Sequence, residues 1–252
     1  MSDDMDQPDG RAGEWQCDEG GSTMSDQPGV QVARAMFEME RGLLLDAARA
    51  LVDDPDAAVA DAAECLDAMI PELAYLDRPE QPMAAPLFQC ATALALYLAL
   101  RERGVAVHDF GAEFLTQLRA FAELLPESPI EYDETMVRLA EESQRSAQPG
   151  EFVFEILPID DTGAWGINML SCAICHHFSK YDAMELVPYM CASDDVLSDQ
   201  FDQGLRRTGT IALGAHHCDF RYHTGEEPLR VGDQYPERIR IRSAAEGSQE
   251  ER

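Results

Sequence analysis

Residues 149–157 have the sequence PGEFVFEIL and mark the point at which the periodicity of the chain changes. From Phe152 to Leu157 side chains alternate with a period of two, which predicts a β-strand. A turn over 160–163 precedes a second predicted strand over 165–172, so the two segments predict an antiparallel hairpin. Residues 208–222 predict a third strand, interrupted at Gly214.

Upstream of this point, residues 30–148 carry apolar side chains at spacings of three and four, which predicts about five helices. The most apolar segment, PLFQCATALALYLALRER over 86–103, predicts a central buried helix that ends at Gly104. Two short helices are expected over 182–191 and 196–205. The fold class that follows is α+β, with an N-terminal helical bundle followed by a small antiparallel sheet and inserted short helices.

The charge of the chain excludes some classes of partner. It has 48 acidic and 19 basic residues, a net charge of -29, which would repel nucleic acid and anionic membrane surfaces. Lys180 is the only lysine, and scarce lysine with excess acid favours a halophilic, salt-rich cytoplasm that screens self-repulsion. The sequence has no uninterrupted run of 18 apolar residues and no signal-peptide pattern, so we expect a cytoplasmic protein without a nucleic-acid or membrane partner.

The two ends of the chain differ from its middle. Residues 1–29 hold eight acids and few apolar side chains, a composition typical of disorder. The start MSDDMDQP resembles MSDQP at 24–28, which makes Met24 an alternative translation start. We therefore expect four parts: a disordered acidic tail over 1–29, a helical region over 30–148, an α+β region over 149–223 and a charged tail over 224–252.

Chemically reactive side chains concentrate in the α+β region. The 60 residues from Ala164 to His223 contain four of the seven cysteines and five of the six histidines. Cytoplasmic cysteines are expected to be reduced, so they serve as core residues, metal ligands or nucleophiles. The sequence contains no GxGxxG, GxxxxGK[ST], HExxH or GxSxG motif, which argues against the common nucleotide, zincin and serine-hydrolase sites.

The first reactive segment is the CxxC of Cys172 and Cys175, at the end of the second predicted strand. It could offer two thiolates to a metal, or one nucleophile of lowered pKa. Equally, the two could be small buried side chains, and a continuing strand would send them to opposite faces. Cys191 lies on an apolar helical face, where a core role is the simpler interpretation, and Asp194 or Asp195 after it could be a helix N-cap.

The second segment precedes the end of the third predicted strand. In an unbroken strand Thr210, His216 and Cys218 would face one way, whereas Asp219 and Arg221 would face the other. One face would pair the His216 imidazole with the Cys218 thiol. The other would bring together the Asp219 carboxylate and the Arg221 guanidinium, which can bind an anion. An edge strand with outward polar residues is the structural alternative.

Four cysteines also have the spacing C-x2-C-x15-C-x26-C. Cys172, Cys175, Cys191 and Cys218 are therefore candidate ligands of a zinc ion or an iron–sulfur cluster, although the second paired knuckle of a zinc ribbon is missing. The cofactor stays open between a divalent metal and none.

Together these segments resemble the L-2-amino-thiazoline-4-carboxylic acid hydrolase family. The resemblance covers roughly residues 150–223 and rests on ELVPYMCASDD over 185–195 and RRTGTIALGAHHCDFRYH over 206–223. The family's elements are a cysteine after an FxFxI-type strand, a cysteine followed by aspartate, and a final threonine, glycine, cysteine and phenylalanine. They fall on Cys172, on Cys191 with Asp194, and on Thr210, Gly214, Cys218 and Phe220.

The resemblance implies hydrolytic ring opening of a cyclic amidine-like carboxylate to an N-carbamoyl cysteine. In one mechanism Cys218 or Cys172 attacks, and His216 accepts the proton. The candidate groups that bind the small-molecule carboxylate or assist the acid–base step are Arg207, Arg221, Thr210 and Asp219. In the other mechanism Cys172, Cys191 and Cys218 hold a metal whose water attacks.

Two other classes of function use the same residues. One is a non-enzymatic sensor of small molecules or metals that keeps the cysteine cluster. The other is a thiol-dependent redox or group-transfer protein that uses Cys172 and Cys175.

Overall fold

The computed structural model describes residues 27–124, 132–226 and 229–230. Most of the expected tails over 1–29 and 224–252 lie outside the described residues. The first helix, α1 (Pro28–Leu51), begins two residues before the expected helical region, and Gly29 and Val30 at its start are buried.

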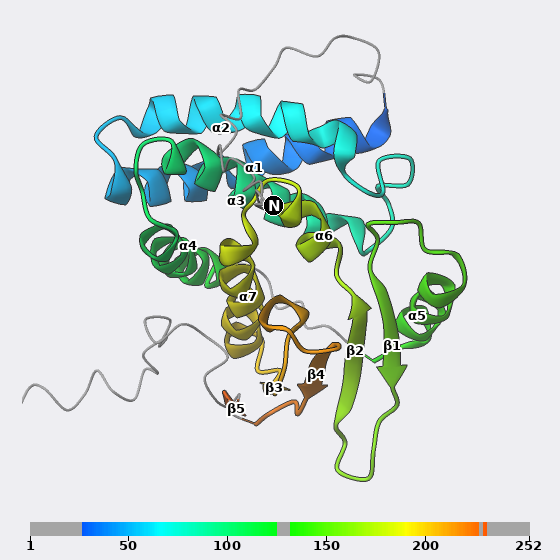
Figure 1. Cartoon of the computed structure of the whole chain (residues 1–252). Coiled ribbons are helices and arrows are strands. Elements are labelled where there is room, and N and C mark those ends of the chain that lie inside the picture. The colour runs from blue at the N-terminus through cyan, green and yellow to red at the C-terminus, as the bar shows by residue number, and fades with distance from the viewer. Residues whose placement is uncertain (1–26, 125–131, 227–228, 231–252) are drawn as a thin grey trace, which may run out of the picture.

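Four helices form the N-terminal bundle: α1, α2 (Pro55–Met69), α3 (Ala84–Arg101) and α4 (Val107–Ala122). A 3-10 turn, η1 (Ile70–Glu72), extends α2. The α2 helix starts at a clear sequence signal, because Asp54 accepts a hydrogen bond from the Ala57 amide at 3.1 Å and Pro55 follows it. Figure 1 shows these helices stacked on one side of the molecule.

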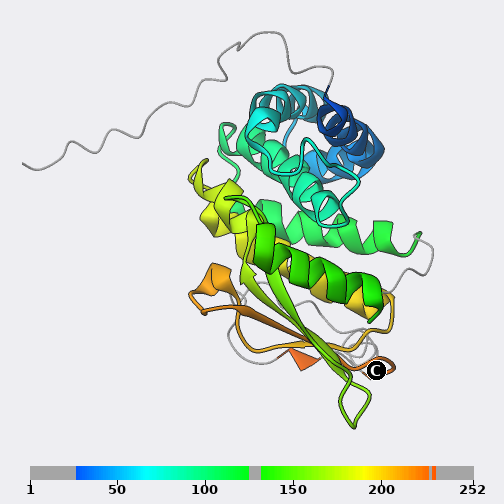
Figure 2. The same cartoon turned by 90° about the vertical axis from the view of Figure 1, so that its right-hand side faces the viewer.

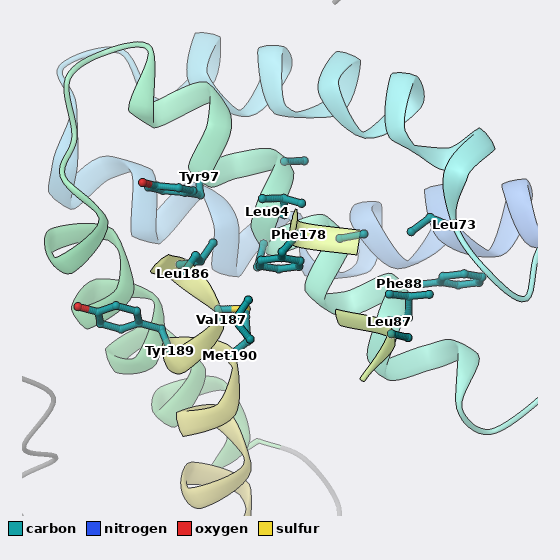
Figure 3. Packing of buried hydrophobic residues seen from close by; sticks show 14 of the residues in the cluster. Leu73, Leu87, Phe88, Leu94, Tyr97, Phe178, Leu186, Val187, Tyr189 and Met190 are labelled. Carbon is teal, nitrogen blue, oxygen red and sulfur yellow. The ribbon is translucent and has the colours of Figure 1, made fainter. Parts of the chain in front are cut away.

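The central helix of the bundle is α3, as its apolar sequence predicted. By length and composition it could cross a membrane, but 67% of its most apolar window is buried inside the protein. It packs against α1, α2 and the later helix α6 (Ala173–Ser179). Figure 3 shows Leu94 and Tyr97 of α3 in one apolar layer with Phe178 of α6. The apolar character of α3 is therefore accounted for by the core.

The bundle and the α+β region share this core. The helix α7 (Val187–Gln200) lies beside α4, and the Tyr189 ring occupies the space in which a side chain at Gly111 would stand. A Cβ atom at Gly111 would lie 2.1 Å from Cδ1 of Tyr189, so glycine is required there. The Tyr97 hydroxyl donates to Glu185 at 2.8 Å from the same interface. The two halves are thus packed as one body at this contact.

The fifth helix, α5 (Glu134–Ser146), packs against the sheet instead of the bundle. It covers the free edge of β1 (Val153–Leu157). There the Ser143 hydroxyl accepts a hydrogen bond from the Phe154 amide at 3.1 Å, and the Gln144 side chain donates one to the Phe154 carbonyl at 3.0 Å. These side chains satisfy backbone groups that have no neighbouring strand. Figure 2 shows α5 lying along the β1–β2 hairpin.

The predicted α+β fold is confirmed. The sheet contains β1, β2 (Trp165–Ser171), β3 (Leu205–Arg207), β4 (Cys218–Tyr222) and β5 (Leu229–Arg230), in the order β1-β2-β4-β3-β5. All neighbouring strands are antiparallel except β3 and β5. The hairpin expected from the period of two is β1–β2, with Phe154 paired to Met169.

Three local expectations differ from the structure. Of the strand expected over 208–222 only β4, over 218–222, forms, because η3 (Ile211–Leu213) and Gly214, at φ 90°, turn the chain between β3 and β4. The two helices expected over 182–191 and 196–205 are one helix, α7, preceded by η2 (Met184–Leu186), since no glycine or proline interrupts 189–200. The segment after β2 is the helix α6, so the strand does not continue past Ser171.

The pleat divides the sheet into two faces. The side of the sheet that we call the inner face carries five buried residues: Phe154, Ile167, Cys218, Tyr222 and Arg207. We call outer face the side that carries Glu155, Asn168, Asp219, Arg221 and Arg206, all partly exposed. Since α7 supplies partners to Arg207, this helix covers the inner face. Side chains that are adjacent in sequence on β4 thus lie in different surroundings.

Candidate active site

Five cysteines from four parts of the fold gather above the inner face. We call this group the cysteine cluster: Cys90 of α3, Cys172 before α6, Cys175 of α6, Cys191 of α7 and Cys218 of β4. They lie near enough that a negative charge on Cys172 acts on the ionisation of each of the other four thiols. Cys172 is therefore at the centre of the cluster.

The position of Cys172 explains why its thiolate is favoured. The strand β2 ends and α6 begins at this residue, which is the N-cap of the helix. The Cys175 thiol and the nearby backbone amides of Cys175 and Ile174 favour the Cys172 thiolate and lower its pKa, although burial acts in the opposite direction. Free amides at a helix start have this effect without any specialised side chain.

The other thiols of the cluster are held in the protonated form. The interaction with Cys172, followed by burial, raises the pKa of Cys175. Burial raises the pKa of Cys191 and of Cys90. Burial also raises the pKa of Cys218 to about 11, against the effect of the Ile211 amide, which donates to its sulfur at 3.2 Å. Within the cluster, Cys172 is therefore the thiol most ready to act as a nucleophile.

Arg207 lies below the cluster with 3% of its surface exposed. It donates to Asp194 Oδ2 at 2.8 Å, to the Cys191 carbonyl at 2.7 Å and to Asp195 Oδ2 at 3.4 Å. Its guanidinium carbon also lies 4.9 Å from the centre of the Phe220 ring. This predicted substrate ligand is thus engaged with protein groups, and it orients Asp194.

Asp194 is the acidic group nearest to the chemistry of the cluster. Burial raises its pKa to about 6, against the effect of Arg207. Its charge acts on Cys172, Cys191 and Cys218, and 40% of its side chain remains accessible to solvent. A carboxyl group with such a pKa can both hold and release a proton near neutral pH.

Two predicted residues lie on the outer face, away from the cluster. Asp219 accepts hydrogen bonds from the Thr208 amide at 2.9 Å, the Gly209 amide at 2.7 Å and the Thr208 hydroxyl. Burial alone would raise the pKa of Asp219, but these donors outweigh it and lower the pKa. Arg221 donates to the Phe220 carbonyl at 2.7 Å and to Asn168 Oδ1 at 2.8 Å. Both side chains stabilise the loop and sheet where they lie.

Thr210 and His216 occupy the segment that divides the predicted strand. Thr210 is 1% exposed and precedes η3, and its buried hydroxyl has no hydrogen-bond partner among the described residues. His216 lies in an exposed bend before β4, and within the described part of the chain it has no hydrogen bond to Cys218. The pairing of imidazole with thiol required an unbroken strand, which η3 and Gly214 prevent.

The candidate metal ligands are brought together without forming a ligand set. Cys172, Cys175, Cys191 and Cys218 all belong to the cluster, as their spacing suggested. Yet over residues 27–124, 132–226 and 229–230 no three cysteine, histidine or carboxylate side chains are arranged to hold a metal ion.

Three residues near the cluster were not predicted. Cys90 lies within the most apolar helix, so its sequence context indicated only a core role. Glu40 of α1 is beside it, and burial raises the pKa of Glu40 to about 7, against a hydrogen bond with Gln89. A carboxylate within an apolar stripe was the available signal. His177 of α6 is 2% exposed, and burial lowers its pKa to about 4, which keeps the ring neutral.

A cavity of about 360 Å³ lies along α5, at some distance in the fold from this chemistry. Its lining includes Tyr132, Asp133, Val137 and Arg138, and none of the cysteines. We therefore identify the candidate site by its reactive groups and not by cavity volume.

Comparison with known families gives one match. The family model for L-2-amino-thiazoline-4-carboxylic acid hydrolase matches residues 90–222, more than half of the chain. The matched segment begins at Cys90 and ends with β4, so it contains the whole cysteine cluster together with Asp194 and Arg207. No curated protein matches the chain, and no solved structure does.

Proposed function

We propose that this chain, which belongs to the L-2-amino-thiazoline-4-carboxylic acid hydrolase family, hydrolyses a cyclic amidine carboxylate of the aminothiazoline type with Cys172 as the nucleophile. The observation that carries the proposal is the setting of Cys172. It is the thiol of the cluster whose pKa is lowered, and it stands where the strand β2 ends and the helix α6 begins.

The chemistry follows from the substrate's ring. The Cys172 thiolate adds to the carbon that carries the ring nitrogen, the ring sulfur and the exocyclic nitrogen. The bond from this carbon to the ring sulfur then breaks, and the released thiolate takes up a proton. Water next adds to the same carbon, loses its protons and displaces Cys172, which leaves an N-carbamoyl cysteine. The sum is one substrate plus one water, with no change in oxidation state.

Asp194 is the group that we assign to the proton transfers. With a pKa of about 6 it can protonate the departing ring sulfur and later accept a proton from the attacking water. The buried Arg207 holds its carboxylate in one orientation at 2.8 Å. Cys218, whose pKa is raised to about 11, is the weaker candidate for the nucleophile. Binding of the substrate carboxylate by Arg207, Arg221 or Thr210 stays a prediction.

The test is turnover of L-2-amino-thiazoline-4-carboxylate by the reduced protein in molar KCl, with N-carbamoyl cysteine followed by mass spectrometry. The high salt reflects our further proposal that the protein works in a salt-rich cytoplasm, which its net charge of -29 favours. Cys172→Ser should lower turnover on the order of a thousandfold, because serine lacks an accessible anion. Cys65→Ser, in α2 and outside the cluster, should retain the parent rate.

Other outcomes have defined meanings. Full activity of Cys172→Ser would exclude it as the nucleophile, and loss only in Cys218→Ser would transfer that role to Cys218. Loss of activity on chelation, restored by a divalent metal, would favour the metal-bound water. Binding of the substrate without turnover by folded protein would favour the sensor.

A further inference from the structure

Cys175 has a thiol that the hydrolytic mechanism does not consume. It lies three residues after Cys172 in the first turn of α6, and the two thiols are near enough that each shifts the pKa of the other. Side chains at this helical spacing are about 5–6 Å apart at their Cβ atoms, and a disulfide needs about 3.5–4.5 Å, so a small backbone adjustment at the N-cap Cys172 is required to form the bond. Both residues are partly exposed, whereas Cys218 is buried.

We propose that Cys172 and Cys175 form a reversible disulfide in reaction with low-molecular-weight disulfides, and that this bond inactivates the hydrolytic site. The second part rests on the proposed function, because it requires Cys172 as the nucleophile. The first part stands on the geometry of the CxxC at the start of α6 and does not depend on any hydrolytic activity.

The exchange takes place in two balanced steps. The Cys172 thiolate attacks one sulfur of the small disulfide, which forms a mixed disulfide and releases one small thiolate that takes up a proton. Cys175 then loses its proton, attacks the Cys172 sulfur and releases the second small thiol. Two protein thiols are oxidised and one small disulfide is reduced to two thiols. Excess thiol reverses both steps.

The surroundings explain why Cys175 completes the exchange. In the reduced protein the interaction with Cys172, burial and the charge on Cys172 raise the pKa of the Cys175 thiol and keep it protonated. A mixed disulfide removes the negative charge, so Cys175 becomes easier to ionise when it must attack. Cys191 and Cys218 come from other elements, and burial is the main cause of their raised pKa values. The pair within one helical turn is therefore favoured.

The experiment treats the full chain with oxidised glutathione and measures intact mass without and with dithiothreitol. Cys17 and Cys65 are first replaced by serine, so that thiols outside the cluster do not contribute. This parent should lose two hydrogen atoms, and peptide mapping should place the bond between Cys172 and Cys175. In the Cys175→Ser variant Cys172 should instead retain one glutathionyl group, because the resolving thiol is gone.

Hydrolysis is followed in the same samples. Turnover should fall in proportion to the fraction of disulfide and return with dithiothreitol. A persistent glutathionyl group in the parent, a disulfide mapped to another pair, or protection of Cys172 until the chain is denatured would overturn the proposal. A disulfide at 172 and 175 with undiminished turnover would instead overturn Cys172 as the nucleophile. A disulfide in a protein that hydrolyses no aminothiazoline would overturn the proposed function and leave the dithiol site.

Discussion

The inner and outer faces of the sheet carry similar residue types in opposite settings. Arg207 on the inner face is buried between Asp194 and Asp195. In contrast, Arg221 on the outer face donates hydrogen bonds to backbone carbonyls and to the side-chain oxygen of Asn168. The carboxyl groups differ in the same way, since the pKa of Asp194 is raised and that of Asp219 is lowered. The comparison teaches that burial of charge, and not residue identity, separates the reactive face from the structural one.

The largest difference should appear in the two arginines. Arg207→Met should reduce the free energy of unfolding by about 3–5 kcal/mol, because it leaves the buried Asp195 and the partly exposed Asp194 without their cation. Arg221→Met should cost about 1 kcal/mol, the value of hydrogen bonds at a partly exposed position. Urea unfolding of both variants beside the parent measures the two losses. Equal losses would contradict the distinction between the faces.

A smaller effect is expected at Asp219. Asp219→Ala should cost about 1 kcal/mol near neutral pH, because the Thr208 and Gly209 amides lose their acceptor. Since the pKa of Asp219 is lowered on folding, its contribution is complete above the ordinary Asp pKa and is lost as pH falls through the folded value. The difference between parent and variant in urea midpoint should therefore shrink on acidification. A constant difference would show that the carboxylate charge is not involved.

The smallest effect on stability is expected at Asp194, and its dependence on pH should be opposite to that of Asp219. The pKa of Asp194 is raised from 3.8 to about 6, so its contribution to stability is present below the ordinary Asp pKa and is lost as pH rises through about 6. With 40% of the side chain exposed, the slope should be well below the limit of about 1.4 kcal/mol per pH unit for one proton. Asp194→Asn should flatten the change in unfolding free energy between about pH 4 and about pH 7. An unchanged slope in this variant would assign it to another group.

Much of the candidate site was predictable because its residues lie in distinctive local sequence. The CxxC at 172–175, Cys191 and Cys218 all belong to the cysteine cluster, and the charge of Asp194 acts on three of its thiols. The association of Cys90 with them could not be predicted, because a cysteine in an apolar helix is typical of a core. His216 and Cys218 were expected on one face through strand periodicity. That rule does not apply to His216, because residues 216 and 217 form a bend and the strand begins only at Cys218.

The sequence alone determined the α+β class, the central helix α3 and the β1–β2 hairpin, because hydrophobic periodicity acts over a few residues and reports local structure directly. It also placed the reactive residues in the second half of the chain. Only the tertiary structure decided that α5 covers the sheet edge, that Cys172 stands at a helix start, and that Arg207 and Arg221 lie on opposite faces. These features depend on burial and on contacts between distant segments, and such contacts set the pKa of each thiol and carboxyl group in the site.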